Sequence, residues 1–409
     1  MLVRNLKVCN FKSFRDIDVD LGQLNIIVGA NASGKSNFVE VFRFLSGLTR
    51  PGVGGKLNLS PADLRNRRLG AAKPLRLSVE SDRTYGGRSA WTSNGGGLEI
   101  KTLGTRYSYI FDGAQSEQFH EEISHKVLLS KAGSGDVARA DEDWRGTINI
   151  QASGGILNYS PDVLPIGANI RTESIFEPFF IAEAGKAPGA LIGNPLYFFM
   201  QGFLDKIGIY DIDPSECQSA DPATGKTDLE EDGENLPLAL RAILDDKDAK
   251  RKLYNLLAEL LPFVTHVDVE KSLDDIFLLK LREIFDQDHF LPAYLLSDGT
   301  LSLIAVLVAL YFMDDALVVI EEPDRHMHPF LASRLAGILE DVSRSRQVIA
   351  TTHNPEIVRH VKPSDIFLLS RDREGYSTIT KPVDTEEVQQ FLQNELGMAD
   401  LFTQNLLGA

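Results

Sequence analysis

Short apolar runs alternate with longer apolar patterns of helical spacing at both ends of the chain. The short runs are rich in β-branched residues and end at glycine, acidic or polar positions, which predicts buried strands. The longer patterns predict helices, at residues 37–45 and 301–313. The predicted buried strands include residues 24–28, 318–320, 347–350 and 366–370. Strands and helices in this alternation predict an α/β fold.

The middle of the chain has a different pattern. Polar and apolar residues alternate in several segments broken by glycine, which predicts an antiparallel sheet. These strands are expected at 75–80, 98–102 and 107–111, and residues 2–8 and 16–21, near the start of the chain, are expected to form strands as well. Further along, residues 196–204 predict a buried helix, 211–234 a flexible acidic loop, and 238–261 helices. We therefore expect four parts, at residues 1–165, 166–285 (mostly helical), 286–380 and 381–409, the last a helical tail.

Length and charge narrow the picture. The 409 residues can bury one large core or two to three subdomains. The net charge of −16 argues against broad adhesion to nucleic acid, although the basic residues between 65 and 76 leave a local contact open. The two cysteines, Cys9 in the first strand and Cys217 in a polar loop, fit a reducing cytoplasm. With no long apolar run, we expect no membrane partner and a cytoplasmic location.

The most informative segment is GANASGKS, residues 29–36, between a predicted strand and a predicted helix. Its spacing matches the P-loop pattern, in which backbone N–H groups and a helix N-terminus hold phosphate. A chance match in a glycine-containing loop is the alternative, and the flanking elements disfavour it. We expect Lys35 to reach the β/γ-phosphates of ATP and Ser36 to ligate Mg²⁺. The full set of expected nucleotide contacts here is Gly29, Asn31, Ser33, Gly34, Lys35, Ser36 and Asn37.

The predicted strand at 318–320 ends in two carboxylates, Glu321 and Glu322. This is the Walker B arrangement, in which the first carboxylate holds the Mg²⁺ shell and the second polarises the attacking water. Taken alone, a strand that ends in a solvated acidic turn fits equally well.

Two further segments complete a set. Ser297, in the sequence LSDGT, is a predicted helix N-cap, and its hydroxyl with the N–H of Gly299 would form another anion site. An ordinary capped core helix is the alternative. The predicted strand that starts at residue 347 ends beside His353, which alone would be read as a turn residue.

The order GANASGKS, LSDGT, VVIEEP and ATTHNP resembles that of the ATP-binding-cassette ATPases, and most of all their RecF/SMC/OLD-type branch. The resemblance implies a P-loop NTPase cassette fold with an antiparallel β-subdomain and a helical insertion. It also implies a homodimer in which Ser297 and Gly299 of one subunit contact the ATP of the other. His353 would be the switch histidine, and Lys12 and Ser13 would lie near the nucleotide base.

Three positions depart from the wider cassette pattern. Glu321 replaces the usual aspartate, and His328 stands where the D-loop aspartate is expected. The glutamine of the Mg²⁺ shell is not obvious: Gln151 is our choice, with Gln115 and Gln201 as rivals. A zinc site at His326 and His328 is the less favoured alternative to a D-loop.

The resemblance carries a functional hypothesis. We expect a Mg²⁺-dependent ATPase that acts as a dimeric switch in prokaryotic defence or genome maintenance and drives a protein effector encoded nearby or a nucleic acid. One alternative is an ATP-binding scaffold with negligible hydrolysis that holds a toxin or effector. Another is a DNA-repair clamp. We expect no long coiled coil, and the 56 residues after His353 are too few for a Toprim nuclease domain.

Overall fold

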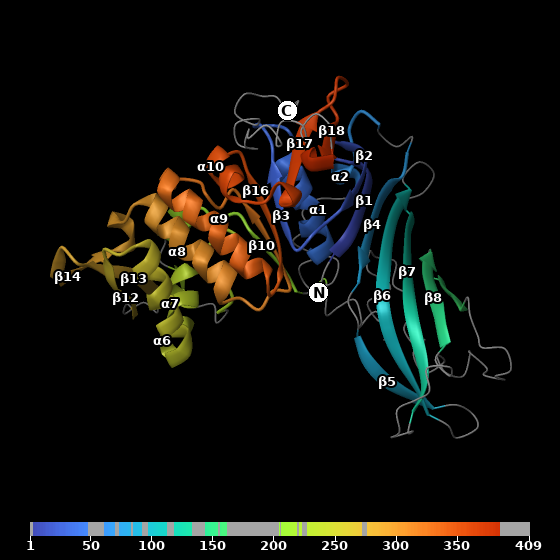
Figure 1. The fold of residues 1–409 in the computed structure, drawn as a ribbon, viewed down its shortest axis with the longest axis horizontal. Helices are drawn as coiled ribbons and strands as arrows, with labels where there is room; N and C mark the ends of the chain where they lie inside the picture. The colour runs from blue at the N-terminus through green and yellow to red at the C-terminus, as the bar shows by residue number, and fades with distance from the viewer. Residues whose placement is uncertain are drawn as a thin grey trace. The chain divides into compact units, whose positions relative to one another are not determined.

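The computed structural model describes the chain in segments (Figure 1). These are residues 3–47, 61–69, 73–82, 85–91, 97–112, 118–132, 144–153, 156–161, 204, 206–218, 221–222, 227–271 and 276–384. The chain divides into two compact units. The first contains Met1–Gly22, Arg43–Lys206 and Asp372–Thr378; the second contains Gln23–Phe42, Ile207–Arg371 and Ile379–Ala409.

The second unit is built on five parallel strands. Their order across the sheet is β10 (Ile207–Tyr210), β15 (Leu317–Glu321), β16 (Gln347–Thr352), β3 (Leu24–Val28) and β17 (Ile366–Arg371). Every residue of β3, β15 and β16 is buried, as expected of parallel strands covered on both faces. The strand predictions at these positions are confirmed. Because the strands are parallel, the segments that follow β3, β15 and β16 lie at one edge of the sheet.

Helices of this unit share one core with the sheet. Apolar residues of α6, α7, α8, α9 and α10 belong to the same buried cluster as those of β3, β15 and β16. Helix α8 is buried along its length from Thr300 to Leu310, which explains why its sequence is apolar on every side. The bounds are α1 Lys35–Gly47, α5 Pro214–Cys217, α6 Leu236–Asp245, α7 Lys247–Leu260, α8 Asp298–Tyr311, α9 Pro329–Ser343 and α10 Pro355–His360.

Three of the four strands of a smaller sheet lie within residues 166–285, the range that we expected to be mostly helical. It contains β11 (Asp221–Pro222), β12 (Val264–Lys271), β13 (Ile276–Glu283) and β14 (Asp286–Pro292), all paired antiparallel. Val264 and Val267 of β12, and Leu279 and Leu281 of β13, enter the common core. Strand β10, from the same range, joins the parallel sheet instead. The four-part division of the chain stays a prediction.

The first unit is mainly antiparallel. Its strand order is β2 (Phe14–Asp20), β1 (Val3–Phe11), β4 (Leu75–Ser81), β6 (Gly97–Asp112), β7 (Gln118–Ala132), β8 (Trp144–Ser153) and β9 (Ile156–Pro161), with β5 (Tyr85–Trp91) paired to β6. It also contains the end of α1 from Arg43, α2 (Pro61–Leu64) and the start of β18 (Ser377–Thr380), where Ser377 pairs with Phe14. Among the described residues, the 3₁₀ helices η5 (Ala293–Leu295), η6 (Pro363–Asp365) and η7 (Pro382–Asp384) belong to the second unit.

Three expectations are corrected. Residues 98–102 and 107–111 belong to one strand, β6, because Gly104 lies at a register shift rather than in a turn. The acidic stretch 211–234 is held in place in its described parts: the N–H of Asp211 donates to the carbonyl of Glu231 at 2.8 Å, and Leu229 is buried. Cys217 lies in α5 and is buried, not in a polar loop.

Some predictions fall outside the described residues. They are the helix at 196–204 apart from Leu204, the helical tail, and the side chains of Gln115 and Gln201. Among the helices that the structure describes, none is long and apolar enough to cross a membrane.

Candidate functional site

The P-loop joins β3 to α1 and turns through two left-handed residues. Ala32 has φ +64° and Gly34 has φ +117°, and glycine adopts the latter without a steric penalty. The helix begins at Lys35, and the N–H of Phe38 donates to the carbonyl of Gly34 at 3.0 Å. The predicted strand, glycine turn and helix are therefore confirmed. Asn31 is exposed, Ser33 is buried and Asn37 is half-buried; their contacts with phosphate stay predictions.

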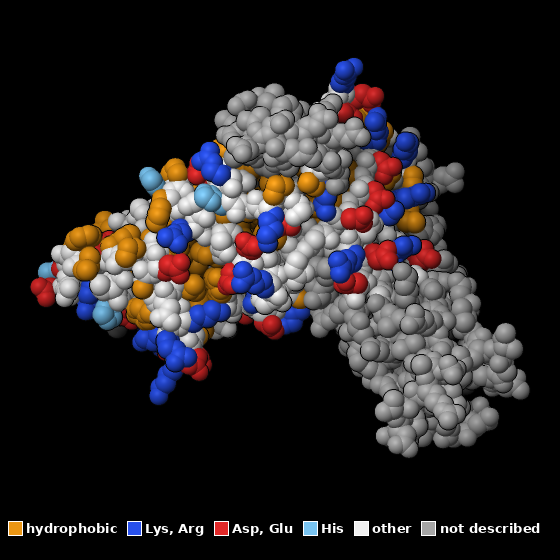
Figure 2. All heavy atoms as spheres, viewed as in Figure 1, with side chains coloured by type: hydrophobic (Ala, Val, Ile, Leu, Met, Phe, Trp, Pro, Cys, Tyr) orange, Lys and Arg blue, Asp and Glu red, His pale blue; other side chains and the backbone are white. Residues whose placement is uncertain are grey.

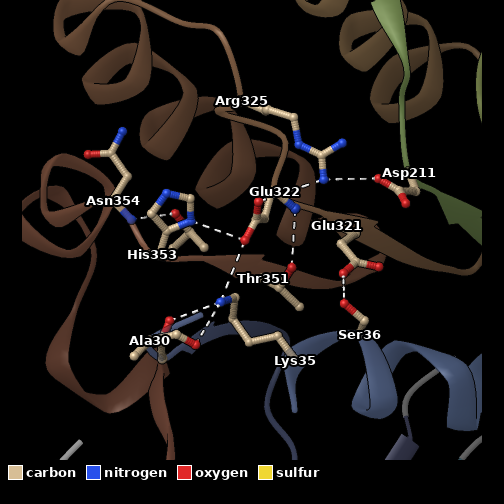
Figure 3. A network of polar contacts seen from close by, with 12 residues as sticks. Ala30, Lys35, Ser36, Asp211, Glu321, Glu322, Arg325, Thr351, His353 and Asn354 are labelled. Atoms are coloured by element: carbon tan, nitrogen blue, oxygen red, sulfur yellow. Dashed lines mark hydrogen bonds and ion pairs between the residues drawn. The ribbon is translucent and has the colours of Figure 1, made fainter. Parts of the chain in front are cut away.

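Lys35 is buried inside this loop (Figure 3). Its ammonium donates to the carbonyls of Gly29 at 2.9 Å and Ala30 at 3.2 Å. A third partner is the carboxylate of Glu322, 3.5 Å from Nζ. A buried charge needs such partners, and phosphate oxygens could replace the loop carbonyls when a nucleotide binds.

Ser36 and Glu321 meet across the sheet edge. The hydroxyl of Ser36, at the second position of α1, hydrogen-bonds to Oε1 of Glu321, the last residue of β15. A hydroxyl and a carboxylate are hard oxygen donors of the kind that Mg²⁺ prefers, so the pair fits this ion. Ser36 and Glu321 would hold Mg²⁺, which would supply positive charge against the phosphate groups of a nucleotide.

Glu322 occupies a tight turn directly after β15. Its backbone is left-handed, with φ +41°, which is unusual for a residue with a side chain. The Glu322 N–H donates to both the carbonyl and the hydroxyl of Thr351 in β16, each at 3.1 Å. These bonds tie the turn to the neighbouring strand and point its carboxylate along the sheet edge (Figure 3).

His353 approaches the same carboxylate from the end of β16. Its Nδ1 lies 3.0 Å from Oε1 of Glu322, and the imidazole is about half exposed. Burial acts to raise the pKa of Glu322, but the hydrogen bond with His353 and the charges of His353 and Lys35 outweigh it, so the pKa lies below its usual range. Asn354 caps α10 by accepting from the N–H of Glu356 at 2.9 Å, which anchors the residue after the histidine.

The signature segment, residues 296–300, has a separate set of contacts. Ser297 caps α8: its hydroxyl accepts from the N–H of Thr300 at 3.2 Å, as predicted. Gly299 lies against the turn that follows Glu322, where an added Cβ would come 2.7 Å from the carbonyl oxygen of His326. The start of α8 and this turn are therefore packed together. Contact of Ser297 and Gly299 with a partner's nucleotide stays a prediction.

His328 has a structural task at the position where an aspartate was expected. It is the N-cap of α9, and its Nδ1 accepts from the N–H of Phe330 at 3.3 Å. His326 adopts a left-handed φ of +64° in the same turn. Across the part of the chain that the structure describes, no group of three or more His, Cys, Asp or Glu side chains is arranged to hold a metal ion.

Three expected residues belong to the first unit. Lys12, with φ +43°, donates its N–H to the carbonyl of Leu64, and the hydroxyl of Ser13 accepts from that of Ser377 at 2.8 Å. Gln151 lies in β8, opposite Glu122 and Asn158. The roles of Lys12 and Ser13 beside the base, and of Gln151 beside Mg²⁺, stay predictions.

Two charged residues of the site, Arg325 and Asp211, were not predicted from the sequence. Arg325 lies three residues after Glu322, and its guanidinium is 3.7 Å from Oε2 of Glu322. The same nitrogen is 3.3 Å from Asp211, which follows β10. The i,i+3 spacing of Arg325 was a usable signal, whereas nothing near Asp211 in the sequence indicates its distant partner.

The fold and these contacts together define a class. A P-loop after one parallel strand, paired carboxylates after a second and a histidine after a third are features of a P-loop ATPase, and their order resembles that of the ATP-binding-cassette type. Two family models agree with this class. "AAA ATPase domain" matches residues 1–67, and "AAA domain, putative AbiEii toxin, Type IV TA system" matches residues 226–359.

No curated protein matches the chain. Three solved structures are similar to it. An SmcHead bound to the C-winged helix domain of ScpA is 15% identical over 93% of this chain and 97% of that chain, with a TM-score of 0.46. The SMC head domain from Thermotoga maritima is 15% identical over 93% and 99%, with a TM-score of 0.40. A Pyrococcus furiosus Smc head domain with an extended coiled coil, bound to the C-terminal domain of ScpA, is 14% identical over 96% and 99%, with a TM-score of 0.44.

Proposed function

We propose that the protein hydrolyses ATP with Mg²⁺ and uses the cycle as a dimeric switch. The observation that carries the hydrolysis is the meeting of Lys35, Glu322 and His353 within 3.5 Å contacts at the sheet edge. A phosphate-binding cation, a carboxylate base and a polar orienting group are the parts that phosphoryl transfer to water needs.

Each side chain has one task in this proposal. Lys35 exchanges its loop carbonyls for the β/γ-phosphate oxygens and counters their charge. Glu322 accepts the proton of the attacking water as the bond to the γ-phosphorus forms and the bond to the ADP oxygen breaks. His353 holds the Glu322 carboxylate in line and contacts the γ-phosphate.

The dimer follows from how the two anion sites are distributed. The chain has one P-loop and one capped signature helix, and Ser297 makes its described hydrogen bonds with Thr300. In the proposed closed state, Ser297 and Gly299 of one subunit cover the nucleotide on the P-loop of the other. ATP then joins the subunits, and hydrolysis releases them.

We propose a protein effector as the partner of this switch, in prokaryotic defence or genome maintenance and in the cytoplasm. The description of one matching family names a toxin–antitoxin system, which supports the defence role. Acidic and basic side chains are interspersed over the described part of the face in Figure 2. With a net charge of −16, this distribution favours a protein over broad nucleic-acid contact.

Glu322→Gln tests the enzymatic part. The amide cannot accept the proton, so steady-state turnover should fall by about 10²–10⁴-fold while ATP still binds. Retained ATP should also favour the closed dimer, measured by sedimentation with ATP and Mg²⁺. If the variant turns over ATP as fast as the unsubstituted protein, Glu322 is not the base. If the wild-type protein shows no ATPase activity, alone or with DNA and neighbouring gene products, the proposal that the protein is an ATPase is wrong.

A second candidate is a scaffold that binds ATP with negligible hydrolysis. It is favoured by the contacts of Glu322, whose two carboxylate oxygens both face positively charged groups or His353. Tight ATP binding with turnover near the background rate would select this candidate.

A further inference from the structure

Arg325 lies between two carboxylates that come from different parts of the second unit. The Arg325 N–H donates to the carbonyl of Glu322 at 2.9 Å, which closes the turn after β15. Its guanidinium Nη2 is 3.3 Å from Oδ1 of Asp211 and 3.7 Å from Oε2 of Glu322 (Figure 3). A single nitrogen thus joins the proposed base to a residue outside the Walker B turn.

Asp211 is held firmly on its own side. Its N–H donates to the carbonyl of Glu231 at 2.8 Å, and the N–H of Asp213 donates to that of Asp232 at 2.9 Å. The segment behind it is fixed by Asn235, a buried residue whose side chain bonds both to the N–H of Glu230 and to the carbonyl of Asp228. The backbone that carries the Asp211 carboxylate is therefore fixed, and Arg325 faces a side chain with a defined point of attachment.

The two oxygens of Glu322 have different neighbours. His353 and Lys35 share Oε1, and Arg325 faces Oε2. A carboxylate contacted on both oxygens has little freedom to rotate, and a planar guanidinium holds such a group better than an ammonium does. The position of Arg325 itself depends on Asp211, which is the nearer of its two partners.

We propose that Arg325 is a positioning residue that orients Glu322 for hydrolysis, and that Asp211 in turn orients Arg325. The inference rests on the proposed ATPase function. The contacts then form a line from Asp211, in the segment after β10, through Arg325 to Glu322, the proposed base. A change in the 228–235 segment would reach the chemistry along this line.

Stability alone does not account for the arrangement. Arg325 is 38% exposed and Asp211 39%, and ion pairs at this exposure stabilise a fold little. Orientation of a reacting group is more sensitive, because a small misplacement can lower a rate severalfold without unfolding anything. Substitutions here should therefore affect turnover more than they affect unfolding.

A double-mutant cycle with Asp211→Asn and Arg325→Gln tests the proposal in the full-length protein with ATP and Mg²⁺. We expect Arg325→Gln to lower kcat about tenfold and Asp211→Asn about threefold, with KM for ATP changed less than about twofold. The double variant should match Arg325→Gln, because Asp211 acts only through the arginine. Arg325→Lys should recover part of the loss.

Two matched controls remove ion pairs away from the site. Arg344→Gln breaks an i,i+3 pair with Asp341, whose atoms are also 3.7 Å apart, and Asp245→Asn breaks an exposed pair with Arg241. Both should keep wild-type turnover. Rates are normalised to bound nucleotide, so that loss of folded protein is not counted as loss of catalysis.

Different results would contradict the role of Arg325 and Asp211 and the proposed ATPase activity. If wild type turns over ATP but the two single effects multiply in the double variant, the line of contacts is wrong and the ATPase stands. The same holds if Arg325→Gln raises KM and leaves kcat intact. A wild-type protein without turnover, or a fully active Glu322→Gln variant, overturns both proposals.

Discussion

Lys35 shows how one side chain can prepare a site before its ligand arrives. The ammonium is buried, and burial of an unpaired charge is costly. Two backbone carbonyls and one carboxylate compensate for the lost water. Bound phosphate would therefore replace existing partners of Lys35. The contribution of Lys35 to nucleotide affinity is then the difference in free energy between its contacts with phosphate and its contacts with the protein.

Cys217 allows a prediction about pH at the residue scale. Burial, with the nearby charges of Asp213 and Asp232, raises the pKa of this thiol to about 12. The thiolate is the reactive form, so at pH 8 Cys217 should resist a thiol reagent in the folded protein and react after denaturation. The raised pKa also means that stability from this group is full below pH 9 and is lost as the pH rises toward 12.

The measurement is thiol counting by mass spectrometry after a short alkylation at pH 8, with and without denaturant. Cys9, which is less buried, is the internal comparison. Equal labelling of Cys217 in both conditions would show that α5 does not shield it.

At the scale of elements, the start of α8 cannot move independently of the turn after β15. Gly299 leaves no room for a side chain beside the carbonyl of His326. Gly337 in α9 is a natural comparison, because an added Cβ there would meet no atom within 4 Å. The same substitution can therefore be compared at a crowded position, Gly299, and at an open one, Gly337.

Gly299→Ala should therefore destabilise the protein by about 1–3 kcal/mol, since the methyl group would force two backbones apart. Gly337→Ala should stabilise it by about 0.5–1 kcal/mol through helix propensity. Urea unfolding followed by circular dichroism measures both. Equal effects of the two substitutions would show that the contact between Gly299 and the turn is not tight.

Local patterns predicted elements well where one segment determines its own environment. The strand before the P-loop and the capped helix after Ser297 were both predicted correctly, because burial and helix capping depend on residues that are close together in the sequence. Gly104 misled the prediction, since a glycine in a strand can mark a bulge as well as a turn. Strand β10 was missed: four residues are too few to show a period.

At the scale of the whole molecule, the site is assembled from segments about 300 residues apart. The resemblance of the motifs to those of the ATP-binding-cassette ATPases implied one site for Ser36, Glu321, Glu322 and His353. The structure brings these residues together because the parallel strands before them end at one edge. They did not predict Arg325 with Asp211, whose meeting depends on β10 pairing with β15. Such a pairing has no local sign in the sequence.

The proposed dimer predicts complementation between two inactive chains. Lys35→Met disables the P-loop, and Ser297→Asp keeps a helix cap while placing a negative charge against phosphate. Each alone should lose most turnover. An equal mixture should regain roughly a quarter of wild-type activity, since half of the two-fold dimers would contain one intact composite site of two.

ATPase assays on the separate and mixed chains measure this regain. A mixture no more active than its components would argue against sites shared between subunits. Lys362→Met, which removes an exposed lysine paired with Glu340, is the control for the methionine substitution.

The left-handed backbone at Glu322 also has a consequence for reading related sequences. A non-glycine residue held at φ +41° costs about 1–3 kcal/mol, which glycine would recover. Drift under selection for heat resistance alone would thus remove the carboxylate from this position. If Glu322 is the base proposed above, a homologue with glycine there would be more stable and would lack the carboxylate needed for the proposed hydrolysis.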